Sequence, residues 1–274
     1  MGIDKVVAKI NWLNKLPLLH KLYIHRRYIV YNAWQELRFR YAGTGIGIFW
    51  NLVHPLCEIT IYTIVFSLLI SRGMREGSYA LYLTSALLPW RTFTEAIMQG
   101  SNTFPQNATY LKRLAIPAEI FVAKVAVTSL FLLFLYLIFI IPLSLIFGGS
   151  LGLSILLLPI LGTLLHGLGF GMELTLANLQ PLFPDLRQAL QFLITLWSWT
   201  MPIFYPESII PEQFKPFLYL NPPYAFLTSI RHVILHNRFP EVHVWGVMFA
   251  WLIVFLVLGA FVNHKLQDEV RDVI

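Results

Sequence analysis

One uninterrupted apolar stretch, from Phe121 to Phe147, constrains this chain more than any other feature, since it carries no charged residue after Lys124. With a rise of about 1.5 Å per residue, one helix of this length crosses the ~30 Å hydrocarbon core of a bilayer. The composition agrees: 57% of the residues are hydrophobic and 12% are charged, against roughly 25% charged in an average soluble domain. Mean hydropathy is +0.66. We therefore expect an all-α polytopic membrane protein.

Apolar stretches of suitable length predict six transmembrane helices within a single domain covering residues 1–274. The fifth is the shortest. A segment before the last helix, 206–243, has too many prolines for one span and is too apolar for a free loop, which predicts short helices in an outer re-entrant segment. The six predicted spans cover residues 46–70, 79–100, 121–147, 151–177, 189–205 and 244–263.

Lys and Arg residues are distributed unevenly around these spans. With the N-terminus inside, fourteen of the twenty lie in inner segments, five in outer segments and Arg91 within a span. This bias predicts that both termini are cytoplasmic. The net charge is +6. Because the basic residues lie beside apolar stretches, we expect membrane lipids with anionic headgroups as partners and not nucleic acid. The chain has no room for a nucleotide-binding domain of ~100–200 residues.

An amphipathic helix is predicted before the first span, over residues 20–42. Tyr23, Val30, Trp34, Leu37 and Tyr41 form an apolar stripe at helical spacing. Arg27 and Arg38 lie at the edges of the stripe. Such a helix is expected to lie in the membrane interface, with aromatic rings among the headgroups and cations near phosphates.

Four ionisable residues fall within predicted spans: Glu58, Arg91, Glu95 and Glu173. Placing each of these side chains against lipid costs on the order of 3 kcal/mol, so we expect them to face protein or a hydrated path. Arg91 and Glu95 are four apart, which allows an ion pair on one helix. Two alternatives stay open: both residues line a hydrated conduit, or they pair with Glu58.

Several smaller features have structural interpretations. His166 is expected to be packed and hydrogen-bonded, and the lone Cys57 to be a small buried residue. Gly167 and Gly171 form a small-xxx-small face for close helix packing. The sequence shows no catalytic constellation and no cluster of Cys or carboxylates around its histidines. We expect neither a bound metal nor a cofactor in this chain.

Six blocks stand in order along nearly the whole chain: WQELRFRYAGTGIGIFWNLVHPL (34–56), LLPWRTFTEAI (87–97), NATYLKRLAIPAEI (107–120), FPDLRQAL (183–190), MPIFYPESIIP (201–211) and YLNPPYAFLTSIRHVIL (219–235). Together they resemble the membrane subunits of type-2 ABC exporters of lipid-linked polysaccharide. This family includes the O-antigen, teichoic-acid and capsule permeases. Phe-Pro-Asp at 183–185 departs from the family's usual aromatic-Arg-Asp.

The resemblance implies a cytoplasmic coupling helix in the region 101–120, which would dock into a groove on a separate ATPase subunit. Its contact residues would be Tyr110, Leu111, Lys112, Arg113 and Leu114. ATP and Mg would bind the partner and not this chain. Because one copy supplies few helices for a wide conduit, we expect a homodimer with two ATPase copies.

The resemblance also implies roles along a substrate path. Arg27, Trp34 and Arg38 would lie where substrate enters, and Glu58, Arg91 and Glu95 would line the channel. Trp197, Trp199 and Tyr205 would stack on sugar rings, although aromatics near the end of a span are also typical of an interface belt. Trp197 and Trp199 lie about 200° apart around a helix, so only one of them can face the channel.

The resemblance implies a non-enzymatic, channel-forming permease for ATP-driven export of undecaprenyl-linked polysaccharide across the inner membrane, with O-antigen as the first candidate. One alternative is an exporter of a drug or small lipid from the same superfamily. Such an exporter would have an apolar cavity open to the side. The other is an intramembrane transferase, which would need a polar cluster at one membrane face. Co-purification with an ATPase separates exporter from enzyme.

Overall fold

The computed structural model describes residues 17–40, 45, 47–70, 79–113, 116–146 and 152–273. Within these ranges the chain is helical, with turns and no strands, as the sequence predicts. The helices are α2 Leu18–Ile24, α3 Arg26–Phe39, η1 Gly47–Phe49, α4 Trp50–Ile70, α5 Tyr79–Ser101, α6 Thr103–Gln106, α7 Ala108–Arg113, α8 Glu119–Ile146, η3 Leu153–Leu157, α9 Leu158–Leu179, α10 Leu186–Trp199, η4 Glu207–Ile209, η5 Glu212–Phe214, α11 Lys215–Leu218, α12 Tyr224–His236 and α13 Val242–Val273.

Each predicted span overlaps a helix: α4, α5, α8, α9 with η3, α10 and α13. The fifth predicted span reaches residue 205, whereas α10 ends at Trp199. Among the parts of the chain that the structure describes, three helical stretches are long and apolar enough to cross a membrane: Glu119–Pro142, Leu153–Leu179 and Val242–Val273. The fifth, α10, has only 14 residues, fewer than the ~20 that a bilayer requires. A count of six spans therefore stays a prediction.

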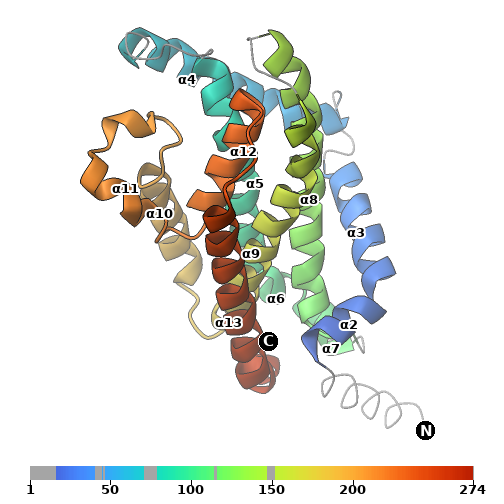
Figure 1. Ribbon diagram of the computed structural model, residues 1–274. Helices are drawn as coiled ribbons and strands as arrows, with labels where there is room; N and C mark the ends of the chain where they lie inside the picture. The colour runs from blue at the N-terminus through green and yellow to red at the C-terminus, as the bar shows by residue number, and fades with distance from the viewer. Residues whose placement is uncertain are drawn as a thin grey trace, which may run out of the picture.

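The bundle is built around α9, which packs against α13, α5 and α8 (Figure 1). Glycines let α9 and α13 approach closely: a Cβ on Gly171 would lie 2.4 Å from backbone atoms of Phe255, and one on Gly259 would lie 2.6 Å from the Gly171 carbonyl oxygen. The predicted packing role of Gly171 is confirmed. Gly167 faces the same helix, since its Cβ would lie 3.0 Å from Leu252.

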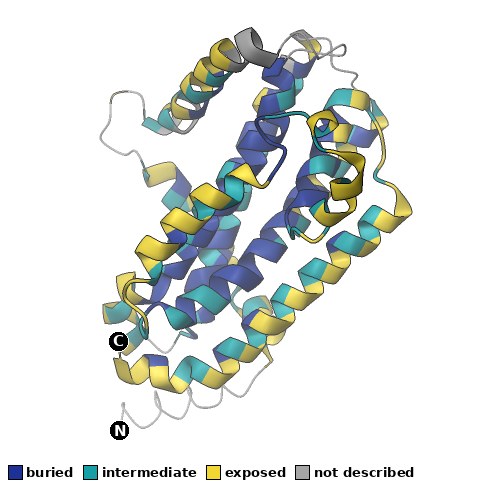
Figure 2. Cartoon of the chain, turned by 90° about the vertical axis from the view of Figure 1, so that its left-hand side faces the viewer, coloured by how far each residue is buried: buried dark blue, intermediate teal, exposed yellow. Residues whose placement is uncertain are grey.

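Buried residues concentrate in the middle of the bundle, while several outer helices carry exposed faces (Figure 2). Exposed apolar residues on α10 include Phe192, Leu193 and Leu196. Cys57 on α4 is also exposed, so its predicted burial is wrong. In a membrane protein such faces contact lipid or another chain, and apolarity alone does not turn them inward.

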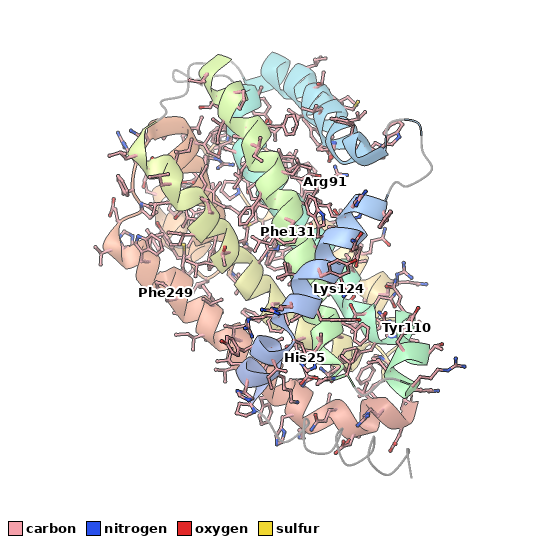
Figure 3. All side chains as sticks on the ribbon, turned by 90° about the vertical axis from the view of Figure 1, so that its right-hand side faces the viewer. His25, Arg91, Tyr110, Lys124, Phe131 and Phe249 are labelled. Carbon is pink, nitrogen blue, oxygen red and sulfur yellow. The ribbon has the colours of Figure 1, made fainter. Side chains whose placement is uncertain are left out.

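The amphipathic region before the first span forms two helices, α2 and α3, which meet at His25. Figure 3 shows α3 lying along α8, beside Lys124 and Phe131. Ile29, Ala33 and Leu37 face the bundle, whereas the described aromatics of the predicted stripe, Tyr23 and Trp34, point outward. Tyr23, Val30 and Trp34 of the predicted interfacial stripe are exposed, whereas Leu37 is buried against the bundle. The interfacial position of the stripe stays a prediction.

The segment 206–243 contains the predicted short helices, η4, η5, α11 and α12. Only α12 packs deeply, against α5 and α9. At one end of the bundle lie α2, α7 and the C-terminal end of α13 (Figure 1). The re-entrant course of 206–243 and the cytoplasmic orientation of both termini remain predictions.

Candidate functional site: charged seams, aromatic face and coupling region

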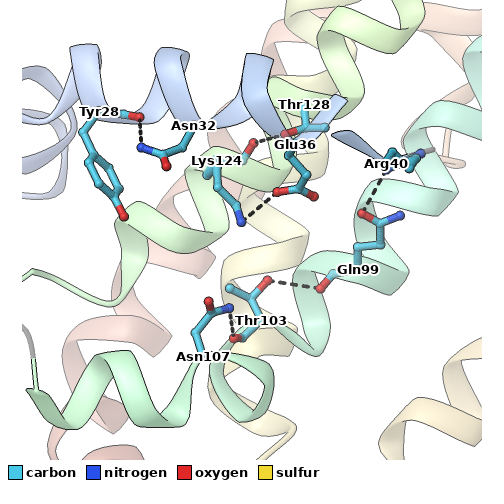
Figure 4. A network of polar contacts seen from close by, with 9 residues as sticks. All are labelled: Tyr28, Asn32, Glu36, Arg40, Gln99, Thr103, Asn107, Lys124 and Thr128. Atoms are coloured by element: carbon cyan, nitrogen blue, oxygen red, sulfur yellow. Dashed lines mark hydrogen bonds and ion pairs between the residues drawn. The ribbon is translucent and has the colours of Figure 1, made fainter. Parts of the chain in front are cut away.

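Three ion pairs fasten α2, α3 and the residue that follows α3 to the bundle. Lys21 Nζ lies 2.6 Å from Glu119 Oε1, and both side chains are almost fully buried. Lys124 Nζ lies 2.7 Å from Glu36 Oε2, and Arg40 Nη1 lies 2.7 Å from Glu95 Oε1. Each pair joins the N-terminal segment to α5 or α8, so these helices are held as part of the bundle. Figure 4 shows the pair of Lys124 with Glu36 and the contact of Arg40 with Gln99.

Gln99 extends the last of these pairs. Its side-chain nitrogen donates to Glu95 Oε1 at 2.8 Å, and its oxygen accepts from Arg40 Nη2 at 3.3 Å. Arg40 thus contacts two α5 residues one helical turn apart. This places the end of the N-terminal helical pair at a defined point on α5.

Arg91 donates a hydrogen bond to Glu58 of α4 and forms an ion pair with it. Of the open alternatives, pairing with Glu58 is confirmed for Arg91, and the ion pair with Glu95 on the same helix is wrong. Burying each charge beside an opposite charge on another helix lowers its cost in a low-dielectric setting. About a third of each of the Arg91 and Glu58 side chains stays exposed, so this α4–α5 seam is accessible. A channel role for Glu58, Arg91 and Glu95 stays a prediction.

The predicted entry residues share one face of α3. Arg27, Trp34 and Arg38 are spaced seven and four residues apart, and all three are exposed. The Trp34 ring meets Phe131 of α8 edge-on, with 6.3 Å between ring centroids. The structure thus brings two cations and an aromatic ring together on an outward surface.

The two tryptophans of α10 have different surroundings, as their spacing predicts. Trp197 is partly buried: its Nε1 donates to Asn221 Oδ1 at 2.7 Å, and its ring meets Trp90 edge-on at 5.3 Å. Trp199 is 56% exposed. Tyr205 donates from its hydroxyl to the Trp199 carbonyl at 3.0 Å. The Trp199 ring is thus largely exposed and Tyr205 is half-buried, whereas Trp197 packs against the bundle. A channel role for these residues stays a prediction.

The coupling region contains the expected short helix, α7. Tyr110 is 58% exposed, and Lys112 and Arg113 are exposed as well. Leu111 instead packs inward against the cluster around Phe104. Leu114 lies outside the described residues.

A cavity of about 130 Å³ opens between α7 and the ends of α8, α9 and α13. Its lining combines apolar side chains with charged ones, which suits a partner surface with one apolar and one charged element. The lining includes Phe104, Leu111, Lys112, Glu119, Val270 and Arg271.

Buried polar groups within the bundle include Glu173 of α9. It has no exposed surface, and neither carboxylate oxygen has a hydrogen-bond partner among the described residues. The prediction that it faces protein is confirmed. His166, two turns earlier, is buried with Nε2 3.3 Å from Thr92 Oγ1, as expected of a packed histidine.

An aromatic clamp between α5 and α12 was missed from the sequence. The guanidinium of Arg231 lies 3.8 Å from the centre of the Tyr82 ring and donates to its hydroxyl at 2.8 Å. The Tyr82 hydroxyl reaches the Tyr205 carbonyl at 3.0 Å, and that of Tyr79 reaches the Phe204 carbonyl at 2.8 Å. The clamp fixes the loop that follows α10. Tyrosines at the start of a span usually indicate only an interface belt, so the sequence carried no specific signal for it.

His232 and His236 lie one turn apart on α12, with ring centroids 5.9 Å apart. The described residues contain no group of three metal-ligating side chains. Two imidazoles without further ligands do not make a zinc site.

The chain belongs to the ABC-2 type transporter family, whose model matches residues 27–235. It is similar to the O-antigen export system permease protein RfbA of Myxococcus xanthus, with 25% identity over 94% of this chain and 99% of that one. It is also similar to the RfbA permease of Klebsiella pneumoniae, at 22% identity over 88% and 92% of the two chains. The polysialic acid transport protein KpsM of Escherichia coli is 21% identical over 85% of this chain and 89% of its own.

The chain is therefore a multi-pass permease of the ABC-2 type, related to permeases of polysaccharide export. The matched region runs from the start of α3 nearly to the end of α12. It includes the coupling region, the aromatic clamp and the ion pairs Arg91–Glu58, Arg40–Glu95 and Lys124–Glu36, whereas Lys21 lies before it.

Proposed function

We propose that this chain is the channel-forming permease of an ATP-driven exporter of undecaprenyl-linked polysaccharide, most closely an O-antigen, in the inner membrane. The observation that carries the proposal is similarity to a relative named as an O-antigen export permease, over 94% of this chain and 99% of the relative. The two sequences thus align over almost their full lengths. Energy comes from a separate ATPase subunit, which binds ATP and Mg and docks at α7.

The active unit in this proposal is a homodimer with two ATPase copies. The exposed apolar face of α10 with Phe192, Leu193 and Leu196, and the exposed α4 residues Leu56 and Ile61, support it. A single copy leaves these faces uncovered, and α10 also carries the exposed Trp199. A second copy placed there encloses a conduit between the two chains.

Substrate would meet the exposed face of α3 first, where Arg27 and Arg38 suit the phosphates of a lipid carrier and Trp34 suits the interface. It would then pass the α4–α5 seam with Glu58, Arg91 and Glu95. Trp199 and Tyr205 would offer flat rings to sugars. Since stacking on an aromatic ring is weak for each contact, a long glycan can slide past.

Deletion of the gene, followed by analysis of surface polysaccharide, tests this function. We expect polysaccharide linked to its lipid carrier to accumulate inside the cell and to disappear from the surface, with both effects reversed by the parent gene. Co-purification should recover an ABC ATPase. An unchanged surface polysaccharide together with a new sensitivity to small drugs would instead favour the drug exporter.

A further inference from the structure

A groove of about 310 Å³ lies between the N-terminal helices, α8 and α9. Its exposed lining is almost entirely apolar, and its volume is at the lower end of the ~300–1,000 Å³ typical of ligand sites. Helix α3 packs on α8 and α8 on α9, and the groove separates α3 from α9. Residues that form its walls include Leu22, Ile29, Val30, Val127, Leu130 and Phe170.

The charged residue among those that line the groove is Arg26, whose guanidinium lies 4.1 Å from the centre of the Tyr23 ring. One of its N–H groups donates to the Tyr23 carbonyl at 2.7 Å. An arginine carries five donors, and the described part of the chain offers no partner for the others. The side chain is therefore held in place by Tyr23 of α2 and keeps donors for an anion.

Among the described residues, no carboxylate forms an ion pair with Arg26. The acidic residues that face α2 and α3 are already paired, Glu119 with Lys21 and Glu36 with Lys124. A planar guanidinium with free donors favours phosphate, which it can bind through two parallel hydrogen bonds. An arginine stacked on a tyrosine beside apolar surface is also typical of the headgroup level of a membrane.

We propose that this groove holds one acyl chain of a resident anionic phospholipid whose phosphate binds Arg26. A second copy of the chain is a less suitable occupant, since the exposed α10 face that suits a second copy lies on the opposite side of the bundle (Figure 1). The transported molecule is a different occupant, because α8 and α9 close the groove toward α5: His166 at its floor is buried against Thr92.

The lipid fills the space that separates α3 from α9 and so adds packing to the ion-paired N-terminal helices. Occupancy should therefore stabilise the fold as well as be measurable by itself. Neither effect requires an ATPase or a glycan, so the test is independent of the proposed function.

Native mass spectrometry of the purified full chain, titrated with dioleoyl-phosphatidylglycerol or dioleoyl-phosphatidylcholine, measures this site. We expect one phosphatidylglycerol to bind at least tenfold more tightly than phosphatidylcholine. Arg26→Gln should remove about tenfold of the phosphatidylglycerol affinity and leave phosphatidylcholine unchanged, since it deletes a charge-assisted contact. Lys265→Gln, an equal loss of charge at an exposed site on α13, should change neither affinity.

Val127→Trp fills the groove from α8 and should lower binding of both lipids at least tenfold. Val30→Trp fills it from the exposed side of α3 and serves if the first variant unfolds. Equal affinity of the parent for both lipids, or parent-like binding by Arg26→Gln or by a folded Trp variant, would overturn the proposal. Displacement of phosphatidylglycerol by an equimolar polyprenyl phosphate would also overturn it, because the groove would then belong to the substrate.

Discussion

Arg91 and Glu58 have their charges satisfied by each other, although they lie 33 residues apart in the sequence and on different helices. The pairs Arg40–Glu95 and Lys124–Glu36 follow the same principle, and each removes the need for a charge to face lipid. The double substitution expected to restore an ion pair is therefore that of Arg91 with Glu58, and not that of Arg91 with Glu95.

We expect Arg91→Glu and Glu58→Arg each to lower thermal stability, since each places like charges together. The double reversal should restore stability, because it restores the pair. Arg91→Glu with Glu95→Arg is the matched control and should not recover, since Glu95 pairs with Arg40. Thermal unfolding of the purified variants measures this.

Export by the same variants decides the channel role. If Arg91 attracts an anionic part of the substrate, the Glu58/Arg91 double reversal will be stable and still defective in export. Full export by the double reversal would mean that the pair serves structure alone.

Trp197→Leu and Trp199→Leu should have different effects. The first loses a hydrogen bond and two edge-on ring contacts, with Trp90 and Phe93, which together amount to about 2–4 kcal/mol. The second should leave stability within about 0.5 kcal/mol, since the ring is largely exposed. We expect only Trp199→Leu to shorten exported glycan at normal protein level. A normal glycan length distribution would assign Trp199 to lipid contact instead.

Helices in this protein have sharply different exposures. Helix α9 is strongly buried and α7 is largely exposed. Helices such as α3 and α10 are intermediate, with one side facing protein and the other facing outward. A residue on such a helix can contact a partner only if it lies on the outward side. Leu111 lies on the predicted docking helix α7, but its side chain packs against its own chain.

Tyr110 is therefore a better probe of ATPase docking than Leu111. Tyr110→Asp should reduce co-purification of the ATPase and abolish export, since it places a carboxylate in an apolar contact. Its thermal stability should match the parent. Leu111→Asp should unfold the coupling region as well and lower stability. Normal ATPase recovery with Tyr110→Asp would exclude α7 as the docking element.

Gly171→Ala tests the contact between α9 and α13. The added methyl group would lie 2.4 Å from the α13 backbone, which forces the two helices apart at a cost of about 1–3 kcal/mol. Gly246→Ala is the matched control, since nothing lies within 4 Å of its added carbon. A parent-like melting temperature for Gly171→Ala would show that the two helices separate at little cost.

The described helices form one bundle with three charged connections to its N-terminal helices. At the scale of the whole molecule, α7 and the C-terminal end of α13 lie together, as expected if both are cytoplasmic. The side on which this end lies follows from the Lys and Arg distribution and is open to direct measurement.

Single cysteines at Gln106 and Glu212, both exposed, test the orientation in a Cys57→Ala background. The substitution at Cys57 is needed because that side chain is itself exposed. An impermeant thiol reagent applied to intact cells should label position 212 and not position 106. Labelling at 106 would contradict the cytoplasmic assignment of α7.

The sequence by itself determined where the helices form, because hydrophobic length and period are local properties. The predicted spans 79–100 and 121–147 match α5 and α8 to within two residues. It also determined the short helix α7 and the packing face of Gly171. Tertiary structure alone decided that Glu58 pairs with Arg91, that Ile29 is buried while Trp34 stays half exposed, and that Tyr82 contacts Arg231. These depend on which helices become neighbours, which a pattern along one helix does not encode.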